Sequence, residues 1–360
     1  MSGLTKKDSA ALKGIAVMMM IYHHCYRSLA KFEDYDVIFR GLTQGQAVYL
    51  GSFCKICVAI FAFVSGYGLM STYLSGKGKG AFSIVGWIKK HMISTASGLW
   101  FTAPAAYLIY GCFFGFRFAK WGDTIGEKVL GILADCLGIS NLLGTKSING
   151  AWWYMSAALI YILLIPLFAE IMERFGAFLC MSLVVLLPRI LGTGYQGSTS
   201  AWSFLLIMTM GMACCRSDFF TGFHKFTIGK SRVGSDIIKG VALAILMFLC
   251  YFGSGQIPIK LVWEYKFAFI PFIYILFFKE FFFRIPIFKE ILAFFGRHSM
   301  YIWLLHSFVQ VYLGKNVFAV REFWLVPVII LLISLVLGLA VEFLRRVSGY
   351  DNLMKKLTSR

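Results

Sequence analysis

Long apolar runs separated by short polar segments extend along the whole chain. A bilayer core about 30 Å thick needs about 20 mostly apolar residues for each helix that crosses it. The apolar runs cover residues 11–30, 48–74, 92–116, 151–172, 176–193, 202–216, 237–253, 262–279, 289–313 and 325–346. This pattern predicts an all-α polytopic membrane protein with about ten transmembrane helices.

One further apolar segment is too short to fit this scheme. Residues 127–143 read EKVLGILADCLGISNLL and carry Asp135 in the middle. A short run with a central carboxylate is typical of a helix that lies at the membrane interface or re-enters the membrane. We therefore expect residues 127–143 not to form an eleventh span, which keeps the number of spans even.

Basic residues give these spans a direction. The chain has 35 Lys and Arg and a net charge of +18. With the N-terminus inside, roughly 22 of the 35 fall on cytoplasmic segments, as the positive-inside rule expects. The most basic internal connection holds Arg216, Lys225, Lys230, Arg232 and Lys239. Because the charges lie between apolar runs, they indicate orientation and not nucleic-acid binding.

The charge pattern places both termini in the cytoplasm. We expect a single transmembrane domain at 1–350 and a basic cytoplasmic tail at 351–360. The expected location is a cell membrane, of the bacterial plasma-membrane type, with lipid as the solvent.

Composition agrees with a lipid environment. Hydrophobic residues make up 59% of the chain and charged residues only 14%, which is more apolar surface than one soluble core can bury. The nine cysteines lie mostly alone in apolar runs, without a CxxC pair beside histidines. We predict neither a disulfide framework nor a metal site.

The first run, ALKGIAVMMMIYHHCYR, places His23 and His24 inside the bilayer, where ionisable groups usually face a cavity or a partner. Lys13 and His24 lie within about 20° of one helical face and about 16 Å apart along the axis. A lysine that holds phosphate and a histidine that acts as a general base fit coenzyme A, with its phosphate-bearing head and thin reactive arm. A packing role for a histidine and an interfacial anchor role for Lys13 are the alternatives.

The second run contains FVSGYGL, in which Ser65 and Tyr67 flank a glycine. Small residues allow close helix packing, and they also leave room for an acyl-carrying arm. A GKGKG run and the pair Lys89 and Lys90 follow on the cytoplasmic side. These lysines are candidates for binding nucleotide phosphates, although such charges are usually only a topology signal.

Two aromatic motifs complete the candidate site. Trp152, Trp153 and Tyr154 open the fourth run, where they suit either an aromatic belt or a sugar-stacking surface. The segment GRHSMYIWLLH runs from Arg297 at the inner mouth to the intramembrane residue His306. His306 is a candidate partner of the first-helix site, and a packing role is equally compatible with the pattern.

Taken in order, these motifs resemble the acyltransferase 3 family of membrane-bound acyltransferases, many of which O-acetylate cell-envelope glycans. The most specific match is a basic residue, ten intervening residues and a histidine, here Lys13 and His24. FVSGYGL, the Trp-Trp-Tyr motif and GRHSMYIWLLH occur in the family's order. The resemblance covers essentially the whole chain.

The resemblance implies that His24, with His23 beside it, is the catalytic base or acyl relay. It also implies that Lys13 helps to hold the acyl donor, usually acetyl-CoA from the cytoplasm. Our further candidates for donor contacts are Ser65, Tyr67, Lys89, Lys90 and Arg297. The acceptor would be a hydroxyl of an envelope glycan or lipid-linked saccharide, bound by Trp152, Trp153, Tyr154 and His306. One departure is that lysines stand where the family has an arginine-rich segment, and they lack the planar fork of arginine.

Two other classes of protein are compatible with intramembrane histidines. A secondary transporter or flippase would use them to relay protons. The chain shows no visible repeat of the kind that marks many transporters, which argues against that class. A receptor-like domain that keeps the fold without the chemistry is the third possibility.

Overall fold

The structure is a computed structural model of the chain and describes residues 3–78, 82–115, 121–192, 196–256, 260 and 262–359. Two predicted spans end at residues 116 and 193, which lie outside the described residues, as do Lys79, Gly80 and Arg360. The α-helices are α1 (Lys6–Tyr26), α2 (Gln44–Phe53), α3 (Cys57–Lys77), α4 (Ile84–Phe114), α5 (Ile125–Leu137), α6 (Trp153–Ile190), α7 (Leu205–Arg216), α8 (Phe219–Lys225), α9 (Arg232–Gly253), α10 (Ile270–Glu280), α11 (Pro286–Arg297), α12 (Ser299–Phe318), α13 (Leu325–Val347) and α14 (Tyr350–Ser359).

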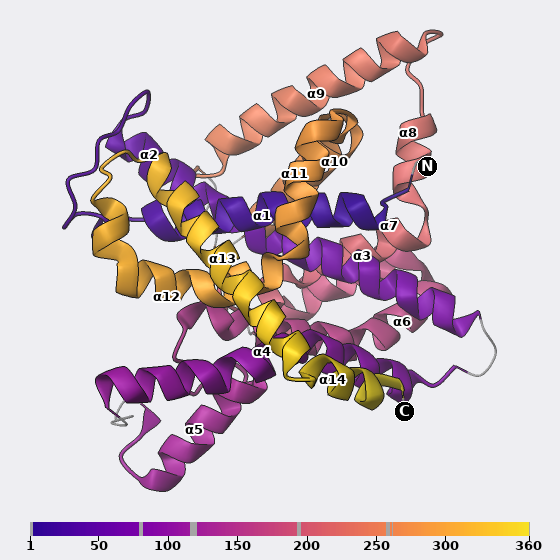
Figure 1. The fold of residues 1–360 in the computed structure, drawn as a ribbon. Coiled ribbons are helices and arrows are strands. Elements are labelled where there is room, and N and C mark those ends of the chain that lie inside the picture. Colours follow the sequence, from indigo (N-terminus) through magenta and orange to yellow (C-terminus); the bar gives the residue numbers. More distant parts are fainter. Residues whose placement is uncertain are drawn as a thin grey trace.

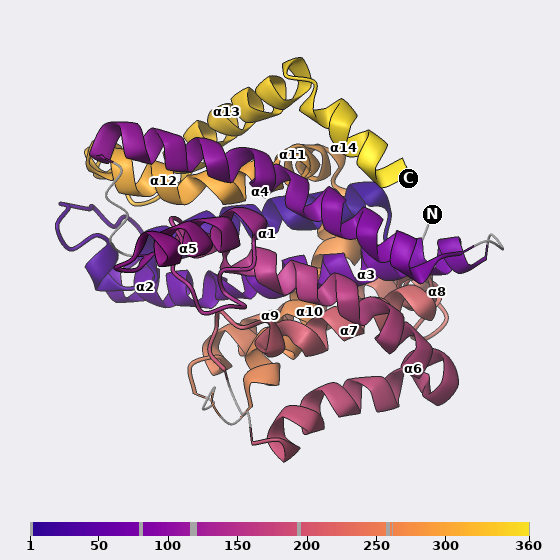
Figure 2. The same cartoon turned by 90° about the horizontal axis from the view of Figure 1, so that it is seen from below.

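The helices form a bundle around α1 (Figure 1). Helix α1 packs against α2, α3, α11, α12 and α13, and the pairs α1/α11 and α3/α7 are the most extensive. In two views at right angles, the N- and C-termini lie at the same end of the bundle (Figures 1 and 2). The described residues contain no β-strand, only one isolated bridge between Ile38 and Glu322. The prediction of an all-α fold is therefore confirmed.

Helix length and composition support a membrane protein but identify fewer spans than the ten predicted. Among the described residues, four segments are long and apolar enough to cross a membrane, or five if a pair bent by 67° counts as one. They are Gln44–Lys77, Gly150–Ile190, Arg232–Gly253 and Leu325–Val347, with the bent pair Ala201–Arg216 and Phe219–Lys225. Among the remaining apolar runs, α10 (11 residues) and α11 (12 residues) are short helices.

At two places the helix boundaries in the structure differ from those predicted from the apolar runs. The predicted break between residues 172 and 176 falls within α6 at Gly176, whose φ of 86° ends one helical half and begins another. The segment predicted as one span at 289–313 consists of two helices, because α11 ends at Arg297 and α12 starts at Ser299. The polar residues Arg297, His298 and Ser299 interrupt the apolar run at this break.

Helix α5 has the shape expected of a non-spanning segment. Its 13 residues give about 20 Å of helix, less than the bilayer core requires. Asp135 is fully buried and accepts hydrogen bonds from Tyr107 (2.8 Å), Ser140 (3.1 Å) and the backbone N–H of Ile148 (2.8 Å). The carboxylate in this segment therefore holds α5 against α4 and the following loop.

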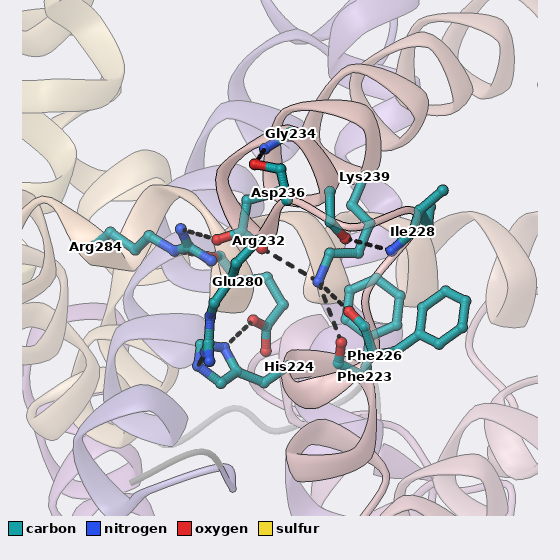
Figure 3. Close-up of polar contacts among 12 residues, drawn as sticks. Phe223, His224, Phe226, Ile228, Arg232, Gly234, Asp236, Lys239, Glu280 and Arg284 are labelled. Carbon is teal, nitrogen blue, oxygen red and sulfur yellow. Dashed lines mark hydrogen bonds and ion pairs between the residues drawn. The ribbon is translucent and has the colours of Figure 1, made fainter.

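Basic residues on the segments predicted to be cytoplasmic also make structural contacts (Figure 3). Lys239 is only 5% exposed, pairs with Asp236 at 3.3 Å and donates to the carbonyl of Phe226 at 3.0 Å. Arg284 binds the same aspartate at 2.8 Å, and His224 contacts Glu280 at 3.0 Å. This cluster joins α8, α9 and the end of α10. At the other end of the chain, the predicted tail is helix α14, anchored by a hydrogen bond from Tyr350 to the Ser97 carbonyl.

The tightest helix contact is made by glycines. A Cβ on Gly296 would lie 1.7 Å from the carbonyl oxygen of Ala10, and one on Gly14 would lie 2.0 Å from that of Leu292. Similarly, a Cβ on Gly66 would lie 2.1 Å from the carbonyl oxygen of Met208 on α7. The Ser-Gly-Tyr-Gly stretch therefore serves close packing at Gly66, as one of its two interpretations expected.

We expect Gly296→Ala to destabilise the protein, because the new methyl group forces α1 and α11 apart. Overpacking of this kind costs about 1–3 kcal/mol of unfolding free energy. The measurement is thermal unfolding of the purified protein in detergent. Gly68→Ala is the matched control, since nothing lies within 4 Å of its added Cβ. Equal stability of the two variants would contradict the packing argument.

Candidate active site

A cavity of about 350 Å³ lies between α1, α3, α4, α6 and α12. Six of the residues predicted from the sequence line it: Lys13, His23, His24, Ser65, Trp153 and Tyr154. They come from three helices that are far apart in the chain. The volume is at the lower end of the range for small-molecule sites, so it suits an arm and a small group more than a bulky ligand.

The two adjacent histidines have different environments. The Nδ1 atom of His23 lies 2.7 Å from the carbonyl oxygen of Gly51. Because a carbonyl only accepts, Nδ1 carries the hydrogen and donates it. The Nε2 atom of His23 is buried and has no hydrogen-bond partner among the described residues. The ring of His24 is half-buried, lines the cavity and lies 5.3 Å from the ring of His23.

His306 lies next to His24, on the side away from the cavity lining. Their ring centroids are 4.8 Å apart, and His306 is 1% exposed. Its Nδ1 donates to the carbonyl of Trp303 at 2.8 Å, which leaves Nε2 to accept from the hydroxyl of Ser307 at 3.2 Å. Both ring nitrogens are therefore engaged within α12. The structure brings His306 to the site as a ring neighbour of His24, outside the cavity lining.

Reciprocal indole hydrogen bonds hold the aromatic motif against α12. Trp152 donates to the carbonyl of Leu304 at 3.1 Å, and Trp303 donates to the carbonyl of Ala151 at 3.1 Å. Asn149 donates to Leu304 as well, at 3.0 Å. Trp152 is 1% exposed and Trp153 is 9% exposed, so these two residues lie inside the bundle and do not form a lipid-facing belt. Trp152 has a structural contact, while Trp153 faces the cavity.

The cavity carries positive charge. Lys13 and Lys55 both line it, and no carboxylate occurs among its described lining residues. The Lys55 ammonium lies 5.3 Å from the centroid of the Trp153 ring. Sequence reasoning missed Lys55, although a lysine inside the apolar run 48–74 is the kind of residue that marks a functional position. Such a lining favours a ligand that bears negative charge.

The other predicted donor contacts do not line the cavity. Tyr67 points to the side of α8, with its ring 6.1 Å from that of Phe220. Lys89, Lys90 and Arg297 are exposed. Lys90 lies one helical turn before Ser94, a lining residue, so it is on the same face of α4 toward the N-terminal end.

Metal-type clusters and disulfides are both missing from the described residues. Among the described residues, no group of three or more His, Cys, Asp or Glu is placed to hold a metal ion. All nine cysteines are free. The polar chemistry of the cavity therefore comes from imidazole, ammonium, hydroxyl and indole groups.

An apolar helical bundle with an imidazole facing an internal cavity lined by lysines fits a membrane enzyme of the group-transfer type. The family model for the acyltransferase domain, acyltransferase 3, matches residues 8–344. The chain therefore belongs to the acyltransferase 3 family and is an acyltransferase. No curated protein and no solved structure matched the chain in the corresponding comparisons.

We expect Trp152→Phe to lower the unfolding free energy by about 1 kcal/mol, because it removes the buried indole hydrogen bond to Leu304. Thermal or denaturant unfolding in detergent measures the change. Trp202→Phe is the control, since Trp202 is 51% exposed. A Trp152→Phe variant no less stable than the Trp202→Phe variant would contradict a stabilising role for the indole pair.

Proposed function

We propose that the protein is an O-acetyltransferase of the cell envelope. It takes an acetyl group from cytoplasmic acetyl-CoA and transfers it to a hydroxyl of an envelope glycan or lipid-linked saccharide at the outer face. The observation that carries this proposal is that Lys13 and His24 line the same cavity. The two residues lie on one helix about 16 Å apart along its axis, so the cavity joins a phosphate-binding cation to a reactive imidazole.

The proposal requires a defined topology in a bacterial plasma membrane. We propose ten spans within residues 1–350, with both termini and the 351–360 tail in the cytoplasm. The position of both termini at one end of the bundle supports an even number of crossings. The bias of basic residues supports the cytoplasmic assignment of that end. The short helices α7, α10 and α11 would then cross together with their neighbours and not alone.

Donor binding would begin at the mouth near the termini. The acyl-carrying arm would enter beside Lys13, whose ammonium can bind a phosphate. The bulky nucleotide would stay outside, because a cavity of about 350 Å³ is small for a whole coenzyme. Lys90, one turn from the lining residue Ser94, and Arg297, two residues before the lining residue Ser299, would contact it there.

At the other end of the cavity, His24 would act on the acceptor. A neutral imidazole nitrogen removes the proton of the acceptor hydroxyl, which then attacks the thioester carbonyl. An alternative order, in which His24 first accepts the acetyl group, uses the same residue as a nucleophile. The rings of Trp153 and Tyr154 line this part of the wall and offer a stacking surface for a sugar. His23 and His306 would hold His24 in place from either side.

We expect His24→Ala to reduce acetylation by about 100- to 10,000-fold, because the general base is lost. The assay follows radiolabelled acetyl groups from acetyl-CoA to isolated envelope glycan in detergent, with the amount of folded protein measured in parallel. His224→Gln is the control, since His224 lies in the α8–α10 cluster and outside the cavity. Full activity of a folded His24→Ala variant would refute the assignment.

We expect Lys13→Met to raise the KM for acetyl-CoA about tenfold or more, with a smaller effect on kcat. The reason is that a charge-assisted hydrogen bond to phosphate, of about 1.5–3 kcal/mol, is lost from donor binding. Steady-state kinetics with varied acetyl-CoA gives both constants. Lys6→Met, an exposed lysine on the same helix, serves as the control. An unchanged KM would show that Lys13 is only an interfacial anchor.

A further inference from the structure

Lys55 is a cation in an unusual place. It lies in a short 3₁₀ turn, Cys54–Ile56, that interrupts the apolar run between α2 and α3. Its side chain is half-buried, lines the same cavity as His24 and stands over the face of Trp153. No ion pair to Lys55 occurs in the described part of the chain, and the described lining holds no carboxylate. A half-buried cation without a counter-ion inside an apolar bundle is costly, which indicates a role in binding or chemistry.

The backbone before Lys55 holds it at the histidine end of the cavity. Gly51 is one turn earlier in the chain, and its carbonyl oxygen accepts the hydrogen bond from His23. A Cβ on Gly51 would lie 2.6 Å from the carbonyl of Tyr26, so α2 touches the last turn of α1 directly. These two contacts join the Lys55 turn to the end of α1 that carries His24, away from Lys13.

Three other N–H donors at this end are already engaged. The Nδ1–H of His23 binds Gly51, and the Nδ1–H of His306 binds Trp303. The indole N–H of Trp303 binds Ala151. Lys55 differs from them, because its ammonium has no hydrogen-bond acceptor in the described contacts. It therefore presents available N–H donors to a ligand near His24.

We propose that Lys55 is a catalytic residue whose ammonium stabilises the oxyanion formed during acyl transfer. This inference rests on the proposed function. When His24 removes the acceptor proton, the acceptor oxygen bonds to the thioester carbonyl carbon, and the C=O π pair moves to the carbonyl oxygen. Lys55 donates a hydrogen bond to that oxygen and keeps its own proton. When the C=O bond re-forms, the C–S bond breaks, and the thiolate of coenzyme A takes the proton from His24.

The test compares Lys55→Met with Lys146→Met, an exposed lysine outside the cavity, in the radiolabelled acetyl transfer assay with isolated envelope glycan. Loss of an oxyanion donor typically lowers kcat by about 100- to 1,000-fold. We expect that loss for Lys55→Met, with the KM for acetyl-CoA within about threefold of the wild-type value. Lys55→Arg keeps the positive charge and should recover part of kcat. Lys146→Met should match the wild type.

Lys13→Met separates catalysis from binding in the same assay, because it should raise the donor KM where Lys55→Met lowers kcat. Unfolding temperatures in detergent identify any variant that is merely misfolded, and Lys55→Gln replaces Lys55→Met in that case. An unchanged kcat, or an effect confined to the KM of either substrate, would overturn the role of Lys55 while the acetyltransferase function stands. A wild-type protein without transfer activity would overturn both proposals.

Discussion

Close contact between the backbones of α1 and α11 is the constraint on which the site depends. Gly14 and Gly296 let the two helices approach until no Cβ fits between them. Because Gly14 faces α11, its neighbour Lys13 is turned about 100° away and reaches the cavity. Helix α11 ends at Arg297, and α12 begins two residues later at Ser299, which also lines the cavity. A small-residue contact therefore sets the position of a cation and of the start of α12.

Charge in the bundle is divided between paired groups and the cavity. Several carboxylates are engaged in ion pairs: Asp8 with Lys289 at 2.5 Å, Glu264 with Arg189 at 2.6 Å, and Glu280 with Lys279 at 2.7 Å. Within each pair, the two opposite charges neutralise each other locally. The cavity lysines have no such partner among the described residues, so their field is directed at whatever enters. An anionic acyl donor fits that field, and an apolar one does not.

The family assignment agrees with a residue order that the sequence already contains. Lys13 and His24 could be predicted as a pair because both lie on one helix, where 100° per residue determines the face on which each side chain lies. Trp153 and Tyr154 could be predicted as candidates because they follow a polar loop at the start of an apolar run. The different environments of His23 and His24 could not, because they depend on the carbonyl of Gly51, which is 28 residues from His23.

The long apolar runs by themselves indicated that the chain is helical, that it is a membrane protein, and where most helices lie. Only the tertiary structure decided that Trp152 is held by Leu304, that Tyr67 turns away from the cavity, and that the helix breaks at residue 298. It alone brought Lys55 into the cavity with His24. The physical reason is range: the period of a helix describes one element, whereas contacts between helices depend on glycine approaches and buried hydrogen bonds between distant residues.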